Sequence, residues 1–475
     1  LNSDLFLKVG YVMIGGMLSP NTDPGFFKTF IHLFIPAAIQ NLFFNLFGIL
    51  DVLMLGQLGD APVAAIGLAG QVFFLLNLTL FGIASGCSVF GAQYWGAQDR
   101  RNLHRMLGLC LVLGLVVAFG FSLLALIFPT QLIGLYTQDA VVIKLAASYL
   151  RVMGWAYLVF PLTIAYSSLL RSTGNTRLPM MVSVVALALN ATLDFCLIFG
   201  WAGFPALGVQ GAAVGTVISR TLECLALLTV IYWKRLPVAA SFKQLFQLDW
   251  TFMSRHIRLV GVVFLNEFFW ALGINVYNAI FARLGTQAYA AYNIATSFNS
   301  LGIFFPMAVM MACGIMIGNA VGAGDEKTAF SIGRRTIWIN IAGSIVLGAL
   351  LVIARNPLLN LYRVSEQTHK DALGILIIAG ALLWLRGLDG MFIVGILRSG
   401  GDTRYSAIVD VGAIWLAGIP AVVLAAFVFH LPLPWVFLAM YAENLVKNIL
   451  GLHRYLSRRW MRNLTQPSPI PEPFA

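Results

Sequence analysis

Twelve apolar stretches, each long enough to cross a lipid bilayer, constrain this chain more than any other feature of its sequence. A membrane-spanning helix needs about 20 consecutive, mostly apolar residues. In the first half, such stretches lie at about residues 29–55, 62–88, 104–128, 141–169, 178–200 and 210–233. In the second half, they lie at about residues 256–282, 288–318, 332–354, 371–397, 405–429 and 433–453. No stretch alternates with a period of two residues, so we predict an all-α polytopic membrane protein and not a β-barrel.

The composition is unlike that of a water-soluble protein. Of the 475 residues, 59% are hydrophobic and only 10% are charged, whereas a soluble domain carries about 25% charged residues. The net charge of +11 would suit a nucleic-acid-binding protein if the basic residues formed one exposed stripe. They lie instead in short clusters between the apolar stretches, where such residues set orientation and contact anionic head groups. We therefore expect contact with membrane lipid and not with nucleic acid.

The basic clusters predict how the chain is oriented. If the first loop faces outward, most lysines and arginines fall in the inward-facing loops and the C-terminal tail, while the outward-facing loops hold only Lys144, Arg283, Arg355, Arg363 and Lys370. The positive-inside rule then places both termini in the cytoplasm. We expect no cleaved signal peptide and place the chain in the inner (plasma) membrane of a bacterium.

The two halves of the chain repeat each other. Trp95-Gly96-Ala97-Gln98-Asp99 matches Val321-Gly322-Ala323-Gly324-Asp325 at a shift of 226 residues. Arg171-Ser172-Thr173-Gly174-Asn175-Thr176-Arg177 matches Arg398-Ser399-Gly400-Gly401-Asp402-Thr403-Arg404 at a shift of 227. With six spans in each half, the two copies enter the membrane in the same direction, as in two-lobed secondary transporters.

The longest polar break, at residues 234–258, marks the boundary between the halves. It mixes basic residues with Phe242, Phe246 and Trp250, a pattern typical of an amphipathic segment at the membrane interface. The sequence thus predicts an N-terminal tail, an N-terminal six-helix lobe, a cytoplasmic linker, a C-terminal six-helix lobe and a C-terminal tail, at residues 1–25, 26–236, 237–254, 255–457 and 458–475.

Among the acidic residues inside predicted spans, four are singled out, because an ionisable side chain there costs about 2.5–3.5 kcal/mol on insertion and usually serves a function. They are Asp51, Asp194, Glu267 and Asp389. Asn190 stands four residues before Asp194, which places both on one face of a helix. The amide and the carboxyl group are therefore placed to share a proton or a cation.

Structural explanations compete with a functional one for some of these residues. Asp389 follows Arg386 by three residues, so a buried structural ion pair remains open. Asp51, Asp194 and Glu267 have no basic residue within reach on their own helix, which leaves hydrogen bonding between helices as the alternative. Two further pairs have the spacing of ordinary helix ion pairs and are left outside the site, Arg220 with Glu223 and Glu443 with Lys447.

Motifs that would indicate an enzyme are missing. Between Gly322 and Lys327 the chain places Asp325 and Glu326, which would repel a phosphate. Neither a zinc-binding helix with two histidines nor a nucleophile elbow is present. We therefore predict no enzymatic activity and no cofactor, and expect an ion gradient to supply the energy.

With these residues in view, the chain resembles the multidrug and toxic compound extrusion (MATE) family over residues 26–460. The resemblance rests on segments that occur in one order along the chain: residues 49–56, 96–99, 170–177, 190–194, 208–216 and 264–267, then Asp389 followed by residues 397–401. Each segment is short, and their order and spacing make the resemblance specific.

The resemblance implies twelve helices in two six-helix bundles, arranged as a V around a central cleft. It implies export of organic cations and other amphipathic small molecules by alternating access, in exchange for H⁺ or Na⁺. In the family, residues matching Asp51, Asn190, Asp194 and Thr216 form a cation site in the N-terminal lobe and would be the ligands of Na⁺. Other branches use acids matching Glu267 and Asp389.

We predict that Asp51, Asp194, Glu267 and Asp389 also bind the substrate, because a cationic drug would compete for the same negative charge. We expect the chain to act as a monomer. The alternative is a flippase for lipids or lipid-linked precursors from the same broad group of transporters. A flippase would need basic residues inside a hydrated cleft to bind a phosphate, whereas the positive residues here lie mainly in the inward-facing loops. A membrane enzyme and a channel are weaker alternatives, because catalytic motifs are missing and the repeat favours alternating access.

Overall fold

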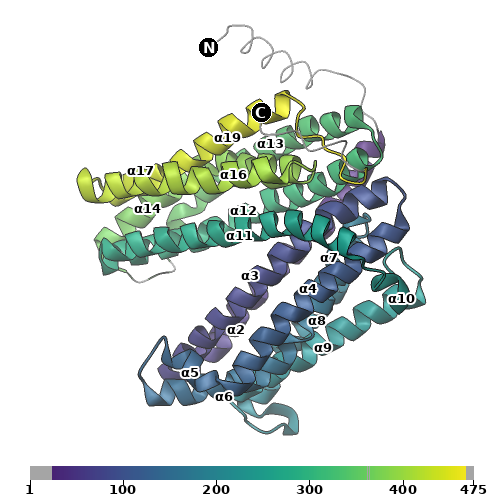
Figure 1. Ribbon diagram of the computed structural model, residues 1–475. Helices are drawn as coiled ribbons and strands as arrows, with labels where there is room; N and C mark the ends of the chain where they lie inside the picture. Colours follow the sequence, from purple (N-terminus) through teal and green to yellow (C-terminus); the bar gives the residue numbers. More distant parts are fainter. Residues whose placement is uncertain (1–23, 361, 363, 467–475) are drawn as a thin grey trace. The chain divides into compact units, whose positions relative to one another are not determined.

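The computed structural model describes residues 24–360, 362 and 364–466, so the predicted N-terminal tail lies almost entirely outside the described residues. The described residues form helices joined by short loops and contain no β-strand (Figure 1). A single isolated antiparallel bridge joins Gly401 and Met461 in this part of the chain. The predicted all-α fold is confirmed.

Every predicted span coincides with a helix or with consecutive helices. Those of the first half are α2 (Pro24–Gly56), α3 (Asp60–Gly96), α4 (Arg100–Ile127), α6 (Ala140–Tyr157) with α7 (Phe160–Ser172), α8 (Arg177–Phe199) and α9 (Val209–Trp233). Short connecting helices are α5 (Pro129–Gly134), η1 (Trp201–Gly203) and α10 (Phe242–Leu245).

The spans of the second half are more often broken. The first three are the continuous helices α11 (Trp250–Arg283), α12 (Thr286–Gly322) and α13 (Glu326–Leu359). The next runs through α14 (Glu366–Ala381), α15 (Leu383–Gly390) and the π-helix η2 (Met391–Arg398). The last two are α16 (Thr403–Ala413), η3 (Ile414–Gly418), α17 (Ile419–Val423) and η4 (Leu424–Val428), then α18 (Leu433–Ala439) and α19 (Tyr441–Leu456).

By length and composition, nine helices in the described part of the chain are able to cross a membrane, or eleven when two bent pairs each count as one span. The α6–α7 pair bends by 45° and the pair at residues 366–398 bends by 53°. The twelfth predicted stretch, residues 433–453, is divided between α18 and α19. Large apolar side chains such as Val116, Phe119 and Leu416 are exposed, as expected of surfaces that face lipid.

The helices form two compact units. The N-terminal unit comprises residues 39–268, and the C-terminal unit comprises residues up to Ala38 and from Phe269 onward. The division therefore falls within α2 and within α11, each of which contributes residues to both units. In the C-terminal unit, the first turns of α2 pack through Phe34 against Phe305 of α12, with ring centres 5.3 Å apart. The lobe limits drawn from the sequence stay a prediction.

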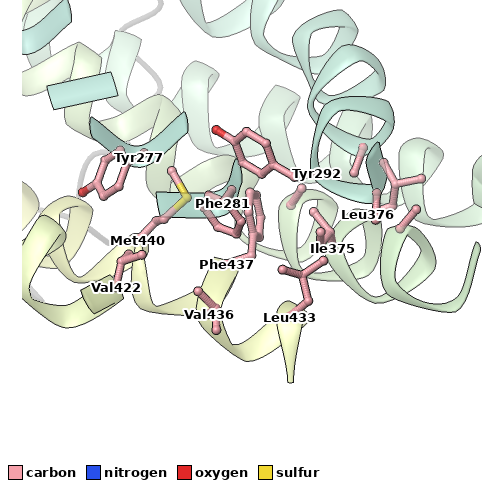
Figure 2. Packing of buried hydrophobic residues seen from close by; sticks show 14 of the residues in the cluster. Tyr277, Phe281, Tyr292, Ile375, Leu376, Val422, Leu433, Val436, Phe437 and Met440 are labelled. Atoms are coloured by element: carbon pink, nitrogen blue, oxygen red, sulfur yellow. The ribbon is translucent and has the colours of Figure 1, made fainter. Parts of the chain in front are cut away.

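Each unit has its own apolar core. Residues of α3, α4, α6 and α9 form the core of the N-terminal unit, with Leu76, Ala118 and Leu150 fully buried. In the C-terminal unit, Figure 2 shows Phe281, Tyr292 and Phe437 gathered in one cluster. The rings of Phe281 and Tyr292 stack with centres 4.1 Å apart. Because lipid tails are as apolar as these side chains, close van der Waals packing is what favours these contacts over contacts with lipid.

The first repeated motif is a helix-to-helix turn with the same geometry in both halves. Gln98 and Gly324 occupy the same position and both adopt the left-handed backbone conformation, with φ of 58° and 78°. The aspartate that follows caps the next helix: Asp99 accepts a hydrogen bond from Asn102 N at 3.0 Å, and Asp325 accepts one from Thr328 N at 2.9 Å. Hydrogen bonds from the Thr328 side chain and backbone lower the pKa of Asp325.

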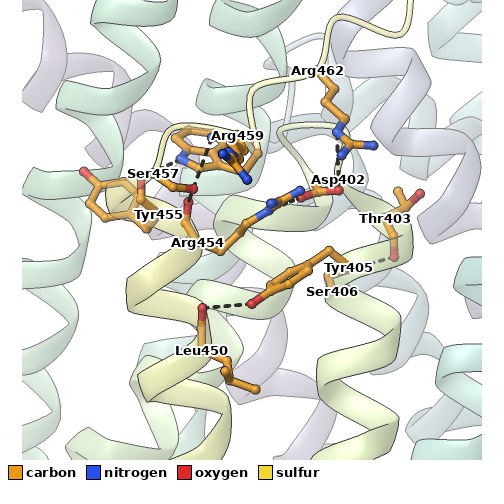
Figure 3. Close-up of polar contacts among 11 residues, drawn as sticks. Asp402, Thr403, Tyr405, Ser406, Leu450, Arg454, Tyr455, Ser457, Arg459 and Arg462 are labelled. Carbon is orange, nitrogen blue, oxygen red and sulfur yellow. Dashed lines mark hydrogen bonds and ion pairs between the residues drawn. The ribbon is translucent and has the colours of Figure 1, made fainter. Parts of the chain in front are cut away.

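The second repeated motif has diverged in its contacts. Gly174 and Gly401 both have positive φ, 90° and 100°, a conformation that favours glycine. In the first copy, Asn175 Oδ1 accepts a hydrogen bond from Leu178 N at 3.3 Å. In the second copy, Asp402 Oδ2 accepts a hydrogen bond from Arg454 Nε at 2.7 Å, and Asp402 Oδ1 lies 3.4 Å from Arg462 Nε (Figure 3). Asp402 thus ties the segment after α19 to the loop before α16.

Candidate functional site

The Asp194 group, which consists of Asn190, Asp194 and Thr216, lies between α8 and α9 of the N-terminal unit. Asn190 Nδ2 donates to Asp194 Oδ2 at 3.1 Å and lies 3.4 Å from Thr216 Oγ1. Thr216 in turn donates to the carbonyl oxygen of Ala212, one turn earlier on α9, at 2.9 Å. Only 4% of the Asp194 surface is exposed. The structure thus brings together three of the residues that were predicted to hold a cation.

Gly215 determines how closely the Asp194 carboxyl group approaches α9. A Cβ atom at this position would clash with Asp194 Oδ1 and would lie 3.3 Å from the backbone nitrogen of Asp194. One turn before it, a Cβ atom on Gly211 would clash with the backbone at Leu197. These two glycines let α8 and α9 pack backbone to backbone, and the carboxyl group lies against the bare surface of α9.

The Asp194 group has the chemistry to hold a small cation. A carboxylate, an amide and a hydroxyl group are hard oxygen ligands of the kind that bind alkali and alkaline-earth ions. The carboxyl group can instead carry a proton, with Asn190 as its hydrogen-bond partner. Both options fit the donors and acceptors present.

The other two candidate acids of the N-terminal unit, Asp51 and Glu267, are not part of the Asp194 group as the structure describes it. Asp51 lies within α2, and its side chain is outside the part of the chain that the structure describes. Glu267 lies on α11, is half-buried, and belongs to the N-terminal unit, whereas Asp389 belongs to the C-terminal unit. The joint cation site of Glu267 and Asp389 that the resemblance implies therefore stays a prediction.

Asp389 belongs to a second group, the Lys447 group, in which three carboxyl groups surround one lysine. The Nζ atom of Lys447 lies 2.8 Å from Asp410 Oδ1, 3.8 Å from Glu443 Oε1 and 3.9 Å from Asp389 Oδ2. Lys447 is 1% exposed, so the ammonium group depends on these carboxyl groups for its solvation. The acids come from α15, α16 and α19, which meet here although they are far apart in the sequence.

Neutral side chains hold two of the acids in place. Asn444 Nδ2 donates to Asp389 Oδ2, and the Tyr277 hydroxyl donates to Glu443 Oε2 at 3.0 Å. A Cβ atom on Gly418 would clash with the Tyr277 hydroxyl and approach Glu443 Oε2 to 3.1 Å. Gly418 therefore leaves the space in which Tyr277 and Glu443 meet.

Among the residues that the structure describes, Lys447 and not Arg386 is the cation within 4 Å of Asp389. Arg386 acts on Asp389 and on Glu443 from a longer distance. The helix pair of Glu443 and Lys447 is present as predicted, but it is part of the Lys447 group and not a separate surface pair. Asp410 was not singled out from the sequence, although it lies within an apolar stretch as the other candidate acids do.

The backbone departs from regular α-helix next to two of these acids. The π-helix η2 begins at Met391, two residues after Asp389, and the π-helix η3 begins at Ile414, four residues after Asp410. Such π-helical turns are rare and often occur at functional sites.

The N-terminal unit also contains an ion pair whose acid, Glu223, is buried and has partners for both carboxyl oxygens. Arg220 Nη1 lies 2.7 Å from Glu223 Oε2, and Ser183 donates to Glu223 Oε1 at 2.7 Å. The predicted helix ion pair is confirmed. Both oxygens of Glu223 are engaged, so the burial of this acid has a structural explanation.

A basic cavity of about 520 Å³ lies at the start of α4, lined by Arg100, Arg101, His104, Gln244 and Gln247. His104 Nε2 is hydrogen-bonded to the carbonyl oxygen of Pro237 at 2.8 Å, and Arg105 pairs with Asp249 at 2.6 Å. The predicted linker between the halves therefore packs on the first turns of α4. The cavity is at a helix end and contains none of the predicted site residues.

Comparisons with known proteins agree on the family. The MatE family model matches residues 36–196 and 263–424, two copies displaced by 227 residues, as the internal repeat predicts. A probable multidrug resistance protein NorM of Thermotoga maritima is 26% identical over 95% of this chain and 96% of its own. A probable multidrug resistance protein NorM of Rhizobium meliloti is 30% identical over 87% of this chain and 89% of its own.

The fold is shared with a solved transporter. The crystal structure of the Vibrio cholerae MATE transporter VcmN in the bent form superposes with a TM-score of 0.83, covering 92% of this chain and 97% of that one at 19% identity. The helices, the repeated halves and the twofold family match lead to one conclusion: this chain is a multi-pass membrane protein that belongs to the MatE (MATE) family of transporters.

Proposed function

We propose that this protein is a secondary active multidrug exporter that exchanges organic cations and other amphipathic compounds for H⁺ or Na⁺. The names of the relatives, probable multidrug resistance proteins, support the substrate class. The observation that carries the proposal is the Asp194 group, a nearly fully buried carboxyl group with an amide and a hydroxyl partner. An ionised carboxyl group buried this deeply is costly in a membrane, and exchange of a cation would give it a function.

The exchange follows from competition for negative charge. The Asp194 carboxyl group holds a proton or Na⁺ with the help of Asn190 and Thr216 while the drug site is empty. Binding of a cationic drug favours release of that ion, because both need the same carboxylates. Thermodynamic reciprocity requires the ion to weaken drug binding by the same factor. Asp51, Glu267 and Asp389 are proposed to join in binding the ion or the drug.

The proposal includes the setting of the protein. We propose a monomer in the bacterial plasma membrane, with both termini in the cytoplasm and a central cleft that opens alternately to the two sides. The positive-inside pattern of the loops supports this orientation. The alternative of a lipid flippase has less support, because the basic cavity in the N-terminal unit lies at the start of α4 and not along a span.

Transport into vesicles under imposed gradients tests this function. Purified protein in proteoliposomes should accumulate radiolabelled tetraphenylphosphonium when a pH or Na⁺ gradient is imposed, and should not do so without one. Asp194→Asn should abolish the dependence on the gradient, while Glu366→Gln, an exposed surface acid, should behave as wild type. Uptake of tetraphenylphosphonium that is the same with and without either gradient would contradict the proposal. Translocation of a labelled phospholipid would favour the flippase.

A further inference from the structure

The basic cavity at the start of α4 lies apart from the residues proposed to bind the ion and the drug. Its volume of about 520 Å³ falls within the range of about 300–1,000 Å³ that is usual for ligand pockets. Two arginines and one histidine line it from α4, and Gln244 and Gln247 line it from the linker between the halves. All five residues belong to the N-terminal unit, and no acid is among them. The cavity thus offers positive charge and amide groups to a ligand.

The two arginines of the cavity are not neutralised by direct ion pairs. The carboxyl group of Asp99 already accepts hydrogen bonds from the first turn of α4, at 3.0 and 2.6 Å. Asp249 pairs with Arg105 at 2.6 Å, and Arg101 acts on it from a longer distance. Among the described residues, neither Arg100 nor Arg101 has a carboxyl group within 4 Å. Because Asp99 caps the helix, the positive charge of the cavity comes from side chains and not from the helix end.

Hydrogen bonds hold the linker, which forms the second wall of the cavity, against the N-terminal unit. His104 Nε2 donates to the carbonyl oxygen of Pro237 at 2.8 Å. The Tyr232 hydroxyl donates to the carbonyl oxygen of Ala240, also at 2.8 Å. The ion pair of Asp249 fastens the far end of the linker, just before α11. Both walls are therefore in place without a ligand, which lowers the entropic cost of binding one.

Gly108 brings α10 into direct backbone contact with α4. A Cβ atom on Gly108 would clash with the carbonyl oxygen of Leu245, the last residue of α10. The Leu245 side chain is buried at this contact, with 5% of its surface exposed. The position of α10, and with it the shape of the cavity, therefore depends on the missing side chain at Gly108.

The face of α10 that carries Phe242 and Phe246 is aromatic and exposed. The two residues stand four positions apart, their ring centres lie 4.5 Å apart, and 79% and 43% of their surfaces are exposed. Gln244 and Gln247, which lie on the other side of this short helix, line the cavity. Aromatic residues on one face of an amphipathic segment insert at the level of the lipid head groups. This places the cavity beside them at the level of the lipid phosphates.

The second half of the chain does not repeat the basic lining. At the shift of 226 residues, Arg100 corresponds to Glu326 and His104 corresponds to Phe330. The helix-to-helix turn and its capping aspartate are nevertheless the same in both halves. The turn therefore forms without these basic residues, and their presence in the first half needs another explanation.

We propose that the cavity binds the phosphate group of an anionic phospholipid, with Arg100 and Arg101 as its cationic partners and Gln244 and Gln247 as hydrogen-bond donors. Guanidinium groups match the geometry of a phosphate. In the proposed orientation the lipid comes from the cytoplasmic leaflet, whose anionic lipids attract basic residues. The exposed aromatic face of α10 favours a lipid over free phosphate, because it provides contacts for the acyl chains beside the cavity.

This lipid is bound and not transported, because the cavity lies at the start of α4 and not along a span. Its phosphate joins α4 to the linker, since it contacts side chains of both. The bound lipid therefore stabilises the linker on α4, an effect that goes beyond the proposed exchange of drugs and ions.

Thermal unfolding of the purified protein in dodecyl maltoside micelles tests this site. Dioleoyl-phosphatidylglycerol should raise the melting temperature more than dioleoyl-phosphatidylcholine, whose choline group cancels the charge of its phosphate. The measured quantity is the concentration of phosphatidylglycerol that gives half of the maximal increase. Each basic residue near an anionic surface contributes about fivefold in affinity, so Arg100→Gln combined with Arg101→Gln should raise this concentration about thirtyfold.

Two pairs of variants control for general effects of charge and packing. Lys327 is exposed and occupies the place of Arg101 in the second copy of the turn, so Lys327→Gln should leave the response to the lipid unchanged. Gly108→Ala keeps every charge but displaces α10, so it should weaken lipid binding. Gly120→Ala on the same helix meets nothing within 4 Å and should not. If the double arginine variant does not fold, Arg101→Gln alone decides, with an expected change of about fivefold.

Inorganic phosphate separates a lipid from a soluble ligand. At the same concentrations as the lipid it should leave the melting temperature unchanged, and Phe242→Ser combined with Phe246→Ser should weaken the response to phosphatidylglycerol. An equal increase with inorganic phosphate would overturn the lipid as the ligand. A wild-type response in the folded arginine variants, or an equal loss in Lys327→Gln, would overturn the site. Transport is not measured, so these results are independent of whether the proposed function holds.

Discussion

At the scale of single residues, Asp194 and Gly215 depend on each other. The carboxyl group occupies the space where any other residue would place its Cβ atom. The hydrogen bond from Asn190 then fixes the orientation of the carboxyl group. A substitution at Gly215 therefore acts on the cation site without touching an ionisable group.

Gly215→Ala should move the Asp194 carboxyl group away from Asn190 and Thr216. Overpacking of this kind costs about 1–3 kcal/mol, and we expect ion-dependent binding of ethidium, a fluorescent organic cation, to weaken about tenfold. Gly120→Ala is the matched control, because a Cβ atom on that helical glycine of α4 meets nothing within 4 Å. Equal ion dependence in the two variants would show that Asp194 does not need this placement.

The repeated turn offers a second comparison between residues. The left-handed backbone conformation is unfavourable for Gln98 but not for glycine at the equivalent Gly324. The difference in conformational free energy is about 1 kcal/mol. Gly324→Gln should lower stability by about that amount, and Gln98→Gly should leave it unchanged or raise it. Thermal unfolding in detergent measures both, and a stabilising Gly324→Gln would refute the explanation.

Part of the site could be predicted residue by residue. The spacing of Asn190 and Asp194 on one helix indicates their contact, and the structure has it. The Lys447 group could not be found this way, because its acids come from three helices and the pair of Glu443 and Lys447 fits an ordinary helix ion pair by itself. Which charged residues of different helices come together depends on how the helices pack. The spacing of residues within one helix does not show this.

At the scale of helices, hydropathy predicts where a span lies but not where it breaks. All twelve apolar stretches correspond to helical segments, yet three of them are interrupted at Leu158–Val159, at Leu382 and at Met440. Apolar residues continue through each break, so the pattern shows no boundary there. The π-helices beside Asp389 and Asp410 are hidden from the sequence for the same reason.

The ion pairs of Asp402 are expected to hold the segment after α19 against the loop before α16. Asp402 is 1% exposed and pairs with Arg454 and Arg462, so Asp402→Asn removes the negative charge that both guanidinium groups contact. We expect a loss of about 3 kcal/mol and release of the chain after α19. Limited proteolysis followed by mass spectrometry should show cleavage between residues 457 and 466.

The control for this variant comes from the repeat. Asn175→Asp changes the equivalent residue of the first copy, where the side chain only caps a helix. An aspartate caps a helix as well as an asparagine does, so stability should change by less than about 0.5 kcal/mol. Unchanged protection of the C-terminal segment in Asp402→Asn would contradict the role of the ion pairs.

At the scale of the whole molecule, orientation is the feature that the distribution of lysine and arginine predicts. Glu366 is in an outward-facing loop of the predicted topology and is 83% exposed, and the five native cysteines are buried. A membrane-impermeant maleimide should therefore label Glu366→Cys in intact cells. A cysteine added after Ala475 should react only in everted vesicles, and the reverse pattern would show the opposite orientation.

The central claim is that buried carboxyl groups give up a cation when a drug binds. Counting ions released on addition of ethidium to purified, weakly buffered protein tests it most directly, with a pH indicator for H⁺ and a selective electrode for Na⁺. The wild type should release one of these ions, Asp194→Asn and Asp389→Asn should each release fewer, and the double variant fewest. A double variant that binds ethidium and releases as many ions as the wild type would contradict the account.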